Sequence, residues 1–325
     1  MAPSTGSYLA GSRLFGLVLV CLLMAAATTT SGYRPDPVTG FPQQSIVVDS
    51  WPGDKKVAVC FVFYVEVWGF GHGPDFRPDM VKRKPDLVNE YYRQYGINEG
   101  IDRIGRLFAR LDVPLSVALS ALFPDQRPEI WASFREIQPG ASIIAHGMNN
   151  STEQLPLAQG LKAQEVYVRK TLDLVEKSVG VRPKGWSSPS VYANVDTYTA
   201  TAAEGIKYSL DAMDSDELSR LQTPSGSLLM IPYPVVTVDM GQNLARQQMP
   251  VMLEQLWTDY VMELVHEAEV DPDRPATVVA IGIHPFVSGT PSGAAALRRV
   301  LERIKEEKLV WLTDVDSIYD HALGQ

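Results

Sequence analysis

The chain has 325 residues, of which 45% are hydrophobic and 21% are charged, and its formal net charge at pH 7 is −9. This length suits one large α/β domain or two small ones, and the composition is that of a globular protein with a sizeable core. The acidic balance excludes a nucleic-acid partner, because phosphate contacts need a basic surface. Neither of the two cysteines has a C-x-x-C partner, which excludes a zinc knuckle and a thiol redox pair.

Residues 1–32 are typical of a signal peptide. One positive charge, Arg13, precedes the apolar run 14–27, and small residues follow that run. The run is short for a membrane span, so we expect no stable span after the leader is removed. Export to the periplasm or the exterior is the first interpretation. The alternative is translation from Met24, which would give a cytoplasmic product.

The rest of the chain predicts an irregular N-terminal arm at 33–53, rich in Pro, Gly and polar residues, and one domain at 54–325. Apolar runs predict strands at 57–67, 114–121, 141–145, 184–188, 207–212, 227–236, 277–283 and 309–312. Helical spacing of apolar residues predicts helices at 98–111, 128–137, 161–179, 195–204, 251–268 and 292–307. Short strands separated by helices imply a parallel sheet, and about seven such units predict an α/β fold of the distorted (β/α) barrel type.

Several predicted strands end in a polar residue. In (β/α) barrels the active site lies at the C-terminal ends of the strands, which the fold brings to one rim. The polar residues that end strands here come from five strands and are Glu66, His146, Ser187, Ser188, Asp211 and His284. Their convergence is the strongest indication in the sequence that the protein is an enzyme.

Glu66 interrupts the apolar segment 61–68. A carboxylate in such a strand is costly to bury unless it is paired, coordinated or kept protonated. These are the settings of a general acid or base. The alternative is a glutamate at a strand end that points to solvent.

His146 and His284 each stand where an apolar run stops, before Gly147 and before Pro285. The shared position favours a functional role for at least one of them, although a lone histidine is more often a hydrogen-bonded core residue. Trp186, in the next segment, is open to two interpretations: one wall of a substrate pocket, or packing in the barrel core.

Four segments, in this order, resemble the polysaccharide deacetylase (NodB-homology) superfamily from about residue 54 to the C-terminus. They are Phe63-Tyr64-Val65-Glu66, His146-Gly147-Met148-Asn149-Asn150, Gly185-Trp186-Ser187-Ser188-Pro189 and Ile283-His284-Pro285. The resemblance implies a distorted barrel of the NodB type. It also implies a hydrolase that acts on carbon–nitrogen bonds other than peptide bonds.

The sequence departs from the family pattern at the metal site. The family's deacetylases use the first residue of an acidic pair as general base, and hold a divalent metal with the second acid and two histidines. Tyr64 stands at the first acidic position, Glu66 at the second, and Asn150 replaces the second histidine. One carboxylate and one imidazole suit zinc poorly, so a divalent metal, held by Glu66 and His146 if it binds, stays an open alternative. The same losses look like the allantoinase-like, cyclic-amide-hydrolase branch.

The first hypothesis is therefore a hydrolase that opens a small cyclic ureide or imide. Glu66 would accept a proton from the attacking water, His146 would orient that water or stabilise the oxyanion, and His284 would protonate the leaving nitrogen. Arg103 would hold Glu66 or a substrate carboxylate. The expected substrate-binding residues are Tyr64, Arg103, Asn150, Trp186 and Ser187.

Two further hypotheses remain open from the sequence. Export favours a polymer substrate, so the protein could be a metal-dependent de-N-acetylase of peptidoglycan or chitin, acting on an N-acetylated saccharide. Loss of an acid and a histidine also fits a catalytically inactive homologue that binds carbohydrate.

Overall fold

The computed structural model of the protein describes residues 32–82 and 84–323. The predicted signal peptide, residues 1–32, lies almost wholly outside them. The strands are β1 (Arg34–Pro35), β2 (Pro42–Ile46), β3 (Val57–Val65), β4 (Ser116–Leu119), β5 (Ser142–Ala145), β6 (Gly185–Trp186), β7 (Tyr208–Ala212), β8 (Leu218–Thr223), β9 (Gly226–Pro232), β10 (Thr277–Ile283) and β11 (Val310–Thr313).

The helices alternate with most of these strands. The α-helices are α2 (Leu87–Tyr95), α3 (Ile101–Leu111), α4 (Phe123–Gln126), α5 (Pro128–Ile137), α6 (Leu161–Val179), α7 (Val195–Ala203), α8 (Pro250–Val270), α9 (Pro291–Lys305) and α10 (Val315–Leu323). Two π-helical turns are η2 (Gly96–Gly100) and η7 (Gly241–Ala245). Short 3-10 turns are η1 (Pro78–Met80), η3 (Thr152–Gln154), η4 (Leu157–Gln159), η5 (Pro189–Val191) and η6 (Val235–Thr237).

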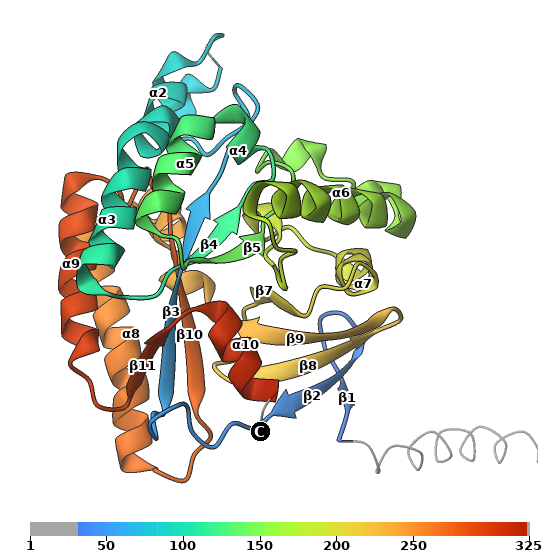
Figure 1. Ribbon diagram of the computed structural model, residues 1–325, viewed down its shortest axis with the longest axis vertical. Coiled ribbons are helices and arrows are strands. Elements are labelled where there is room, and N and C mark those ends of the chain that lie inside the picture. The colour runs from blue at the N-terminus through green and yellow to red at the C-terminus, as the bar shows by residue number, and fades with distance from the viewer. Residues whose placement is uncertain (1–31, 83, 324–325) are drawn as a thin grey trace, which may run out of the picture. The chain divides into compact units, whose positions relative to one another are not determined.

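Seven parallel strands form the barrel, in the order β10-β3-β4-β5-β6-β7-β9, and β11 pairs with the N-terminal half of β3 (Figure 1). Among the described residues no ladder joins β9 to β10. There the hydroxyl of Thr237 donates to the carbonyl of Ala280 at 2.9 Å instead. The predicted α/β fold, a distorted barrel of about seven parallel strands, is confirmed.

Two antiparallel strands extend this sheet beyond β9. β8 pairs with β9, and β2 pairs with β8. The segment 33–53 is therefore not wholly irregular, because β2 lies within it and is ordered by its ladder. The polar sequence Pro-Gln-Gln-Ser-Ile carries no apolar alternation, so the sequence pattern gave no sign of this edge strand.

Period-two alternation along β3 separates the two faces of the barrel wall. Ala58, Cys60, Val62 and Tyr64 pack in the cluster inside the barrel, with side chains from β7, β9 and β10. The alternate residues of β3 pack outward against helices. Glu66 continues the inward-facing series at the end of the strand.

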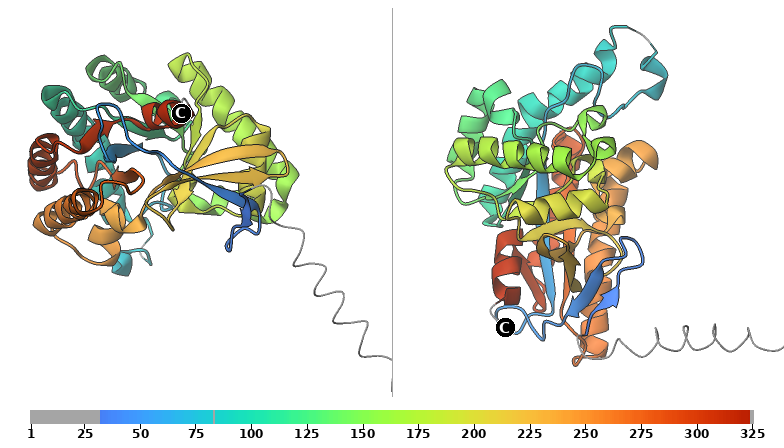
Figure 2. Two further views of the ribbon diagram at one scale, coloured as in Figure 1. Left: turned by 90° about the horizontal axis from the view of Figure 1, so that it is seen from below. Right: turned by 90° about the vertical axis from the view of Figure 1, so that its right-hand side faces the viewer.

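Helices cover the outside of the wall. α3, α8 and α9 lie outside β3 and β10, and α6 and α7 lie outside the strands from β5 to β7 (Figure 1). Seen along the barrel, the helices surround the strands except where β8 and β2 extend the sheet (Figure 2). In residues 32–82 and 84–323 we find no helix with the length and hydropathy of a membrane span.

Candidate functional site

Four neighbouring strands end in a common register at the rim of the barrel. Val65 of β3 lies opposite Leu119 of β4, Leu119 opposite Ala145 of β5, and Ala145 opposite Trp186 of β6. Backbone hydrogen bonds of 3.0 Å extend these ladders by one residue. The residues that follow this row are Glu66, Ser120, His146 and Ser187. The register therefore places their side chains in one row at the mouth of the barrel.

His146 lies between a carbonyl and a carboxylate. Its Nδ1 is 2.8 Å from the carbonyl oxygen of Ser187, and its Nε2 is 2.9 Å from Oε1 of Glu66. A carbonyl oxygen and a carboxylate both only accept, so Nδ1–H donates a hydrogen bond to Ser187 and Nε2–H donates one to the ionised Glu66. Both ring nitrogens are thus engaged, and the prediction that His146 orients water directly needs correction: the imidazole holds Glu66.

Asn150 also holds Glu66. Its Nδ2 donates to Oε1 of Glu66 at 2.5 Å, and its Oδ1 accepts from the hydroxyl of Ser190 at 3.2 Å. The amide therefore holds Glu66 and accepts from Ser190, and a contact between Asn150 and a substrate stays a prediction. Ser190 and Val191 adopt φ angles of 52° and 57°. That region is unusual for a β-branched residue, and such strain is concentrated at functional sites.

His284 pairs with a second buried carboxylate. Its Nδ1 donates to Oδ1 of Asp239 at 2.6 Å, and its backbone N–H donates to Oδ2 at 2.8 Å. The hydroxyl of Ser288 also donates to Oδ2, at 2.5 Å. Burial acts to lower the pKa of His284, but the charge and hydrogen bond of Asp239, together with the charge of Glu66, outweigh it and raise that pKa. The shift favours the imidazolium form of His284.

Glu66 and His284 face each other without touching. Oε2 of Glu66 lies 4.0 Å from Nε2 of His284 and has no hydrogen-bond partner among the described residues. A gap of this size is too long for a hydrogen bond, but one reacting atom can lie within reach of both groups. The two side chains and His146 are between 1% and 3% exposed. The predicted convergence of Glu66, His146 and His284 is thus present in the structure.

Tyr64 lies between the two histidines. Its ring stacks on His284 with centroids 4.6 Å apart and planes at 5°, and meets the His146 ring edge-on at 4.9 Å. Its hydroxyl is 3.4 Å from Oγ of Ser187. Burial raises the pKa of Tyr64, so the phenol stays neutral. Tyr64 therefore supplies packing and a hydroxyl, and no base.

The residues around Glu66 do not fit a divalent metal. Among the described residues no group of three His, Cys, Asp or Glu side chains is arranged to hold one. The donor chemistry agrees: Asn150 presents its NH₂ group to Glu66, and Nε2 of His146 and Oε1 of Glu66 are in direct contact. A metal needs several oxygen, nitrogen or sulfur ligands that face a common point, and zinc prefers His, Cys and carboxylate ligands.

Arg103 does not reach Glu66. It extends from α3 to the carbonyl of Gly289, lies 3.4 Å from the hydroxyl of Tyr95, and forms a 3.7 Å ion pair with Glu99. Of the two roles predicted for Arg103, a contact with Glu66 is absent, and a contact with a substrate carboxylate stays a prediction. Near the start of α3, the side chain points to the loop after β10.

Trp186 belongs to the core outside the barrel. It is 2% exposed and packs with side chains of α6 and α7. Its indole N–H donates to Oγ of Ser188, and that hydroxyl donates to Asp211 at 2.8 Å. Of the two interpretations open from the sequence, core packing describes its contacts.

Two glycines fit backbone segments closely around the site. Gly147, with a φ angle of 64°, follows His146, and a Cβ there would overlap Pro189 and the hydroxyl of Tyr167. Gly100 ends the π-helical turn, and a Cβ there would overlap the carbonyl oxygen of Pro285, next to His284. These close contacts hold in place the backbone next to His146 and next to His284.

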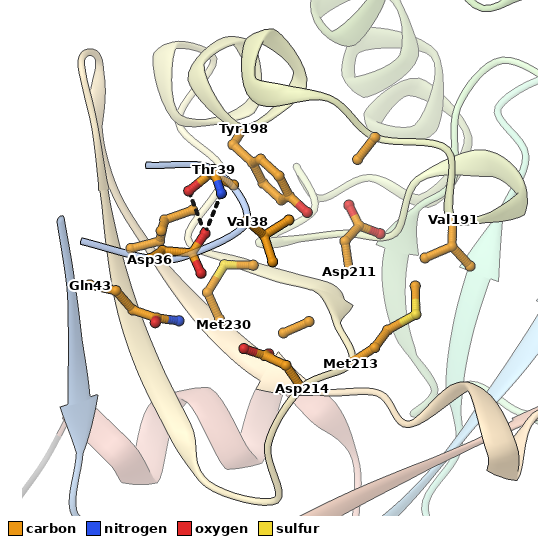
Figure 3. Close-up of a pocket in the computed structure, with 13 residues that line it drawn as sticks. Asp36, Val38, Thr39, Gln43, Val191, Tyr198, Asp211, Met213, Asp214 and Met230 are labelled. Atoms are coloured by element: carbon orange, nitrogen blue, oxygen red, sulfur yellow. Dashed lines mark hydrogen bonds between the residues drawn. The ribbon is translucent and has the colours of Figure 1, made fainter. Parts of the chain in front are cut away.

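A cavity of about 280 Å³ lies beside this centre, at the end of β7 (Figure 3). Asp211 and Val191 form part of its wall. Asp211 accepts hydrogen bonds from the backbone N–H and hydroxyl of Ser188, and burial raises its pKa. The other polar lining residues drawn in Figure 3 are Asp36, Thr39, Gln43, Tyr198 and Asp214.

Sequence reasoning missed Asp239 and Ser120. Asp239 is fully buried and lies in the segment between β9 and β10, where a single acid between Val238 and Met240 gives only a weak signal. Ser120 could have been found, because it is the polar residue that directly follows β4, as Glu66 follows β3.

Comparison with solved structures identifies the fold. A candidate polysaccharide deacetylase from Mycobacterium smegmatis is 21% identical, with a TM-score of 0.70, over 90% of this chain and 96% of that one. A candidate polysaccharide deacetylase from Pseudomonas aeruginosa PAO1 is 24% identical, with a TM-score of 0.72, over 84% and 93%. Puue Allantoinase is 23% identical, with a TM-score of 0.73, over 86% and 94%.

These likenesses confirm, at the level of the fold, the resemblance to polysaccharide deacetylases and to an allantoinase. No family model matches the chain, and no curated protein sequence matches it.

Proposed function

We propose that this chain, which has the fold of polysaccharide deacetylases, is a hydrolase of carbon–nitrogen bonds other than peptide bonds, and that it opens a small cyclic imide or ureide. One observation carries the proposal: a buried carboxylate with one free oxygen faces a buried histidine whose pKa is raised, across a gap of 4.0 Å. This is an acid and a base close enough for one small reacting group beside them to contact both.

Glu66 is the proposed general base. His146 and Asn150 hold Oε1, which leaves Oε2 directed at the attacking water. Oε2 accepts a proton from this water while the water oxygen bonds to the carbonyl carbon of the substrate. Holding the carboxylate from one side fixes its orientation before the substrate arrives, which is how a positioned base gains efficiency.

His284 is the proposed general acid. When the carbon–nitrogen bond breaks, Nε2 of His284 donates its proton to the leaving nitrogen. Asp239 holds Nδ1–H at the far side of the ring and favours the imidazolium that this step requires. The ring-opened product then carries a new carboxyl group, and the leaving nitrogen has gained one hydrogen and is a neutral amide or ureido nitrogen.

Burial of the reacting groups supports a small substrate. Glu66, His146 and His284 are at most 3% exposed, which suits a ligand that is enclosed by the site. A polymer would need these groups to line an open cleft. The side chains around Glu66 do not fit a divalent metal. This also supports a small-ring hydrolase over a metal-dependent de-N-acetylase.

Export is a separate proposal that rests on residues 1–32. The leader supports a mature chain that begins near residue 33, in the periplasm or outside the cell. Mass spectrometry of the protein purified from its native host tests this. A mature N-terminus near residue 33 would support export, and a chain that begins at Met24 would overturn it.

A product assay tests the function. Purified, chelator-treated protein is supplied in parallel with succinimide, allantoin and N-acetylglucosamine oligomers, and ring opening and acetate release are measured. We expect ring opening that the chelator does not affect, and a loss of at least about a hundredfold in Glu66→Gln. Chelator-sensitive acetate release would overturn the proposal in favour of a metal-dependent deacetylase. Retention on chitin or peptidoglycan without any product would favour a carbohydrate-binding homologue.

A further inference from the structure

Four buried side-chain atoms have no hydrogen-bond partner among residues 32–82 and 84–323. They are Oε2 of Glu66, Nε1 of Trp68, Oγ of Ser120 and Nε of Arg93. A buried polar atom without a partner is destabilising, and native proteins contain few of them. The guanidinium of Arg93 is held through its other two nitrogens by Pro74 and Glu90, whereas Trp68 and Ser120 each present a donor that has no task in the acid–base pair. Because an unpaired buried donor lowers stability, we infer that these two donors bind a ligand.

Ser120 lies in the row between Glu66 and His146. Its backbone N–H donates to Val65 at 3.0 Å, and its own neighbour on the other side is His146, whose N–H donates to Leu119. The serine is fully buried. Its side chain therefore lies in the row between Glu66, the proposed base, and His146.

Trp68 lies on the side of His284. Its ring meets Phe286 edge-on at 5.8 Å, and the Phe286 ring is 5.5 Å from that of His284. The backbone of Gly73 fits closely against the indole, because a Cβ there would lie 2.9 Å from Cγ of Trp68. This packing fixes the indole, and with it the direction of its N–H.

We propose that Ser120 and Trp68 bind the two carbonyl oxygens of an imide or ureide ring. The inference rests on the proposed function. In the unit O=C–N–C=O the reacting carbonyl meets Glu66, the nitrogen meets His284 and the second carbonyl lies beyond the nitrogen. The order of the side chains is the same: Ser120 beside Glu66, then His284, then Trp68. Ser120 stabilises the oxyanion that forms on the first carbonyl, and Trp68 selects substrates that carry the second.

The test combines two variants with two ligands. Ser120→Ala and Trp68→Phe each remove one donor, and Ser120→Ala keeps the packing. Succinimide carries two ring carbonyls, whereas 2-pyrrolidinone carries one. We expect Ser120→Ala to lower kcat for succinimide by about a hundredfold with little change in KM. Trp68→Phe should weaken succinimide binding by about tenfold and leave the binding of 2-pyrrolidinone unchanged.

Stability without ligand separates this role from a structural one. Because Ser120→Ala removes an unpaired buried donor with little change of volume, its unliganded Tm should equal or exceed that of the wild type. Trp68→Phe also loses packing, so its role is read from the contrast between the two ligands. A lower Tm with unchanged kcat and KM would assign both side chains to the fold and overturn the inference. If the wild type opens succinimide, Glu66→Gln does not, and both donor variants behave as wild type, only this inference fails. If the wild type opens no ring, the proposed function fails.

Discussion

The two histidines of the site have the same position in their strands but different partners. His146 follows β5 and His284 follows β10, and in each the Nε2 faces Glu66. Nδ1 of His146 donates to a neutral carbonyl, that of Ser187. Nδ1 of His284 donates to the carboxylate of Asp239.

This difference assigns the two imidazoles different tasks. The carbonyl of Ser187 accepts from Nδ1–H of His146 and adds no charge, and Nε2–H of the same ring donates to the carboxylate, so His146 serves to orient Glu66. A buried carboxylate stabilises the charged imidazolium, so His284 is suited to give up a proton. The distances from Nε2 to Glu66 agree with these tasks. His146 lies at 2.9 Å, which is a hydrogen bond, whereas His284 lies at 4.0 Å, so that both His284 and Glu66 can contact one reacting atom.

The largest effect is expected from His284→Gln. Removing the acid should lower kcat by about 10²- to 10⁴-fold, because the leaving nitrogen would have to depart without a positioned proton donor. Steady-state turnover of succinimide measures this loss. His266→Gln, in an exposed position on α8, is the matched control and should keep full activity. Turnover of His284→Gln within a few-fold of the wild type would remove His284 from the mechanism.

Asp239→Asn should shift the pH profile. Asp239 raises the pKa of His284, so loss of its charge lowers that pKa and His284 loses its proton at a lower pH. The alkaline limb of kcat/KM should therefore move to lower pH. The proton on His284 stabilises the folded chain below its unfolded pKa, and this contribution is lost as pH rises through the folded pKa. An alkaline limb that does not move would contradict the assignment of His284 as the acid.

A smaller effect is expected from His146→Gln. Its task is to hold Oε1 of Glu66, and Asn150 continues to hold the same oxygen in the variant. We expect kcat to fall by about tenfold, less than for a group that transfers a proton, with the alkaline limb unchanged. A loss as large as that of His284→Gln would show that the two histidines are equivalent.

Ser190→Ala should have the smallest effect. It removes the 3.2 Å hydrogen bond to Oδ1 of Asn150, and should lower the free energy of unfolding by about 0.5 to 1.5 kcal/mol. Urea denaturation measures this change. Turnover should stay close to that of the wild type, because Glu66 keeps its contact with His146. A large loss of turnover would mean that the amide of Asn150 controls Glu66 more strongly than His146 does.

The helices and buried strands could be predicted because the spacing of their apolar residues matches the face that each element buries. The predicted bounds 128–137, 161–179 and 277–283 are those of α5, α6 and β10. A proline begins α5, and Gly180 in the left-handed region ends α6. β2 and β8 could not be predicted in this way, because short antiparallel strands at a sheet edge depend on their partners more than on their own alternation.

Site residues that directly follow a strand could be predicted from the sequence. Asp239, which lies in the segment between β9 and β10, could not. Glu66, His146 and His284 follow parallel strands, so the barrel topology alone brings them together. Asp239 lies 45 residues before His284 in a segment of short turns, and only folding pairs them. The contact of Arg103 with Glu66 was wrongly predicted because the helical pattern gives the buried face of α3 but not the direction of an extended polar side chain.

The most direct test is an NMR titration of the side-chain nitrogens of His284 in the wild type and in Asp239→Asn. The account predicts that His284 in the wild type keeps its second proton above the ordinary histidine pKa of about 6.5, and that the substitution lowers its titration midpoint. A wild-type midpoint at or below the ordinary value, unchanged in Asp239→Asn, would contradict the different roles of the two histidines and with them the proposed acid.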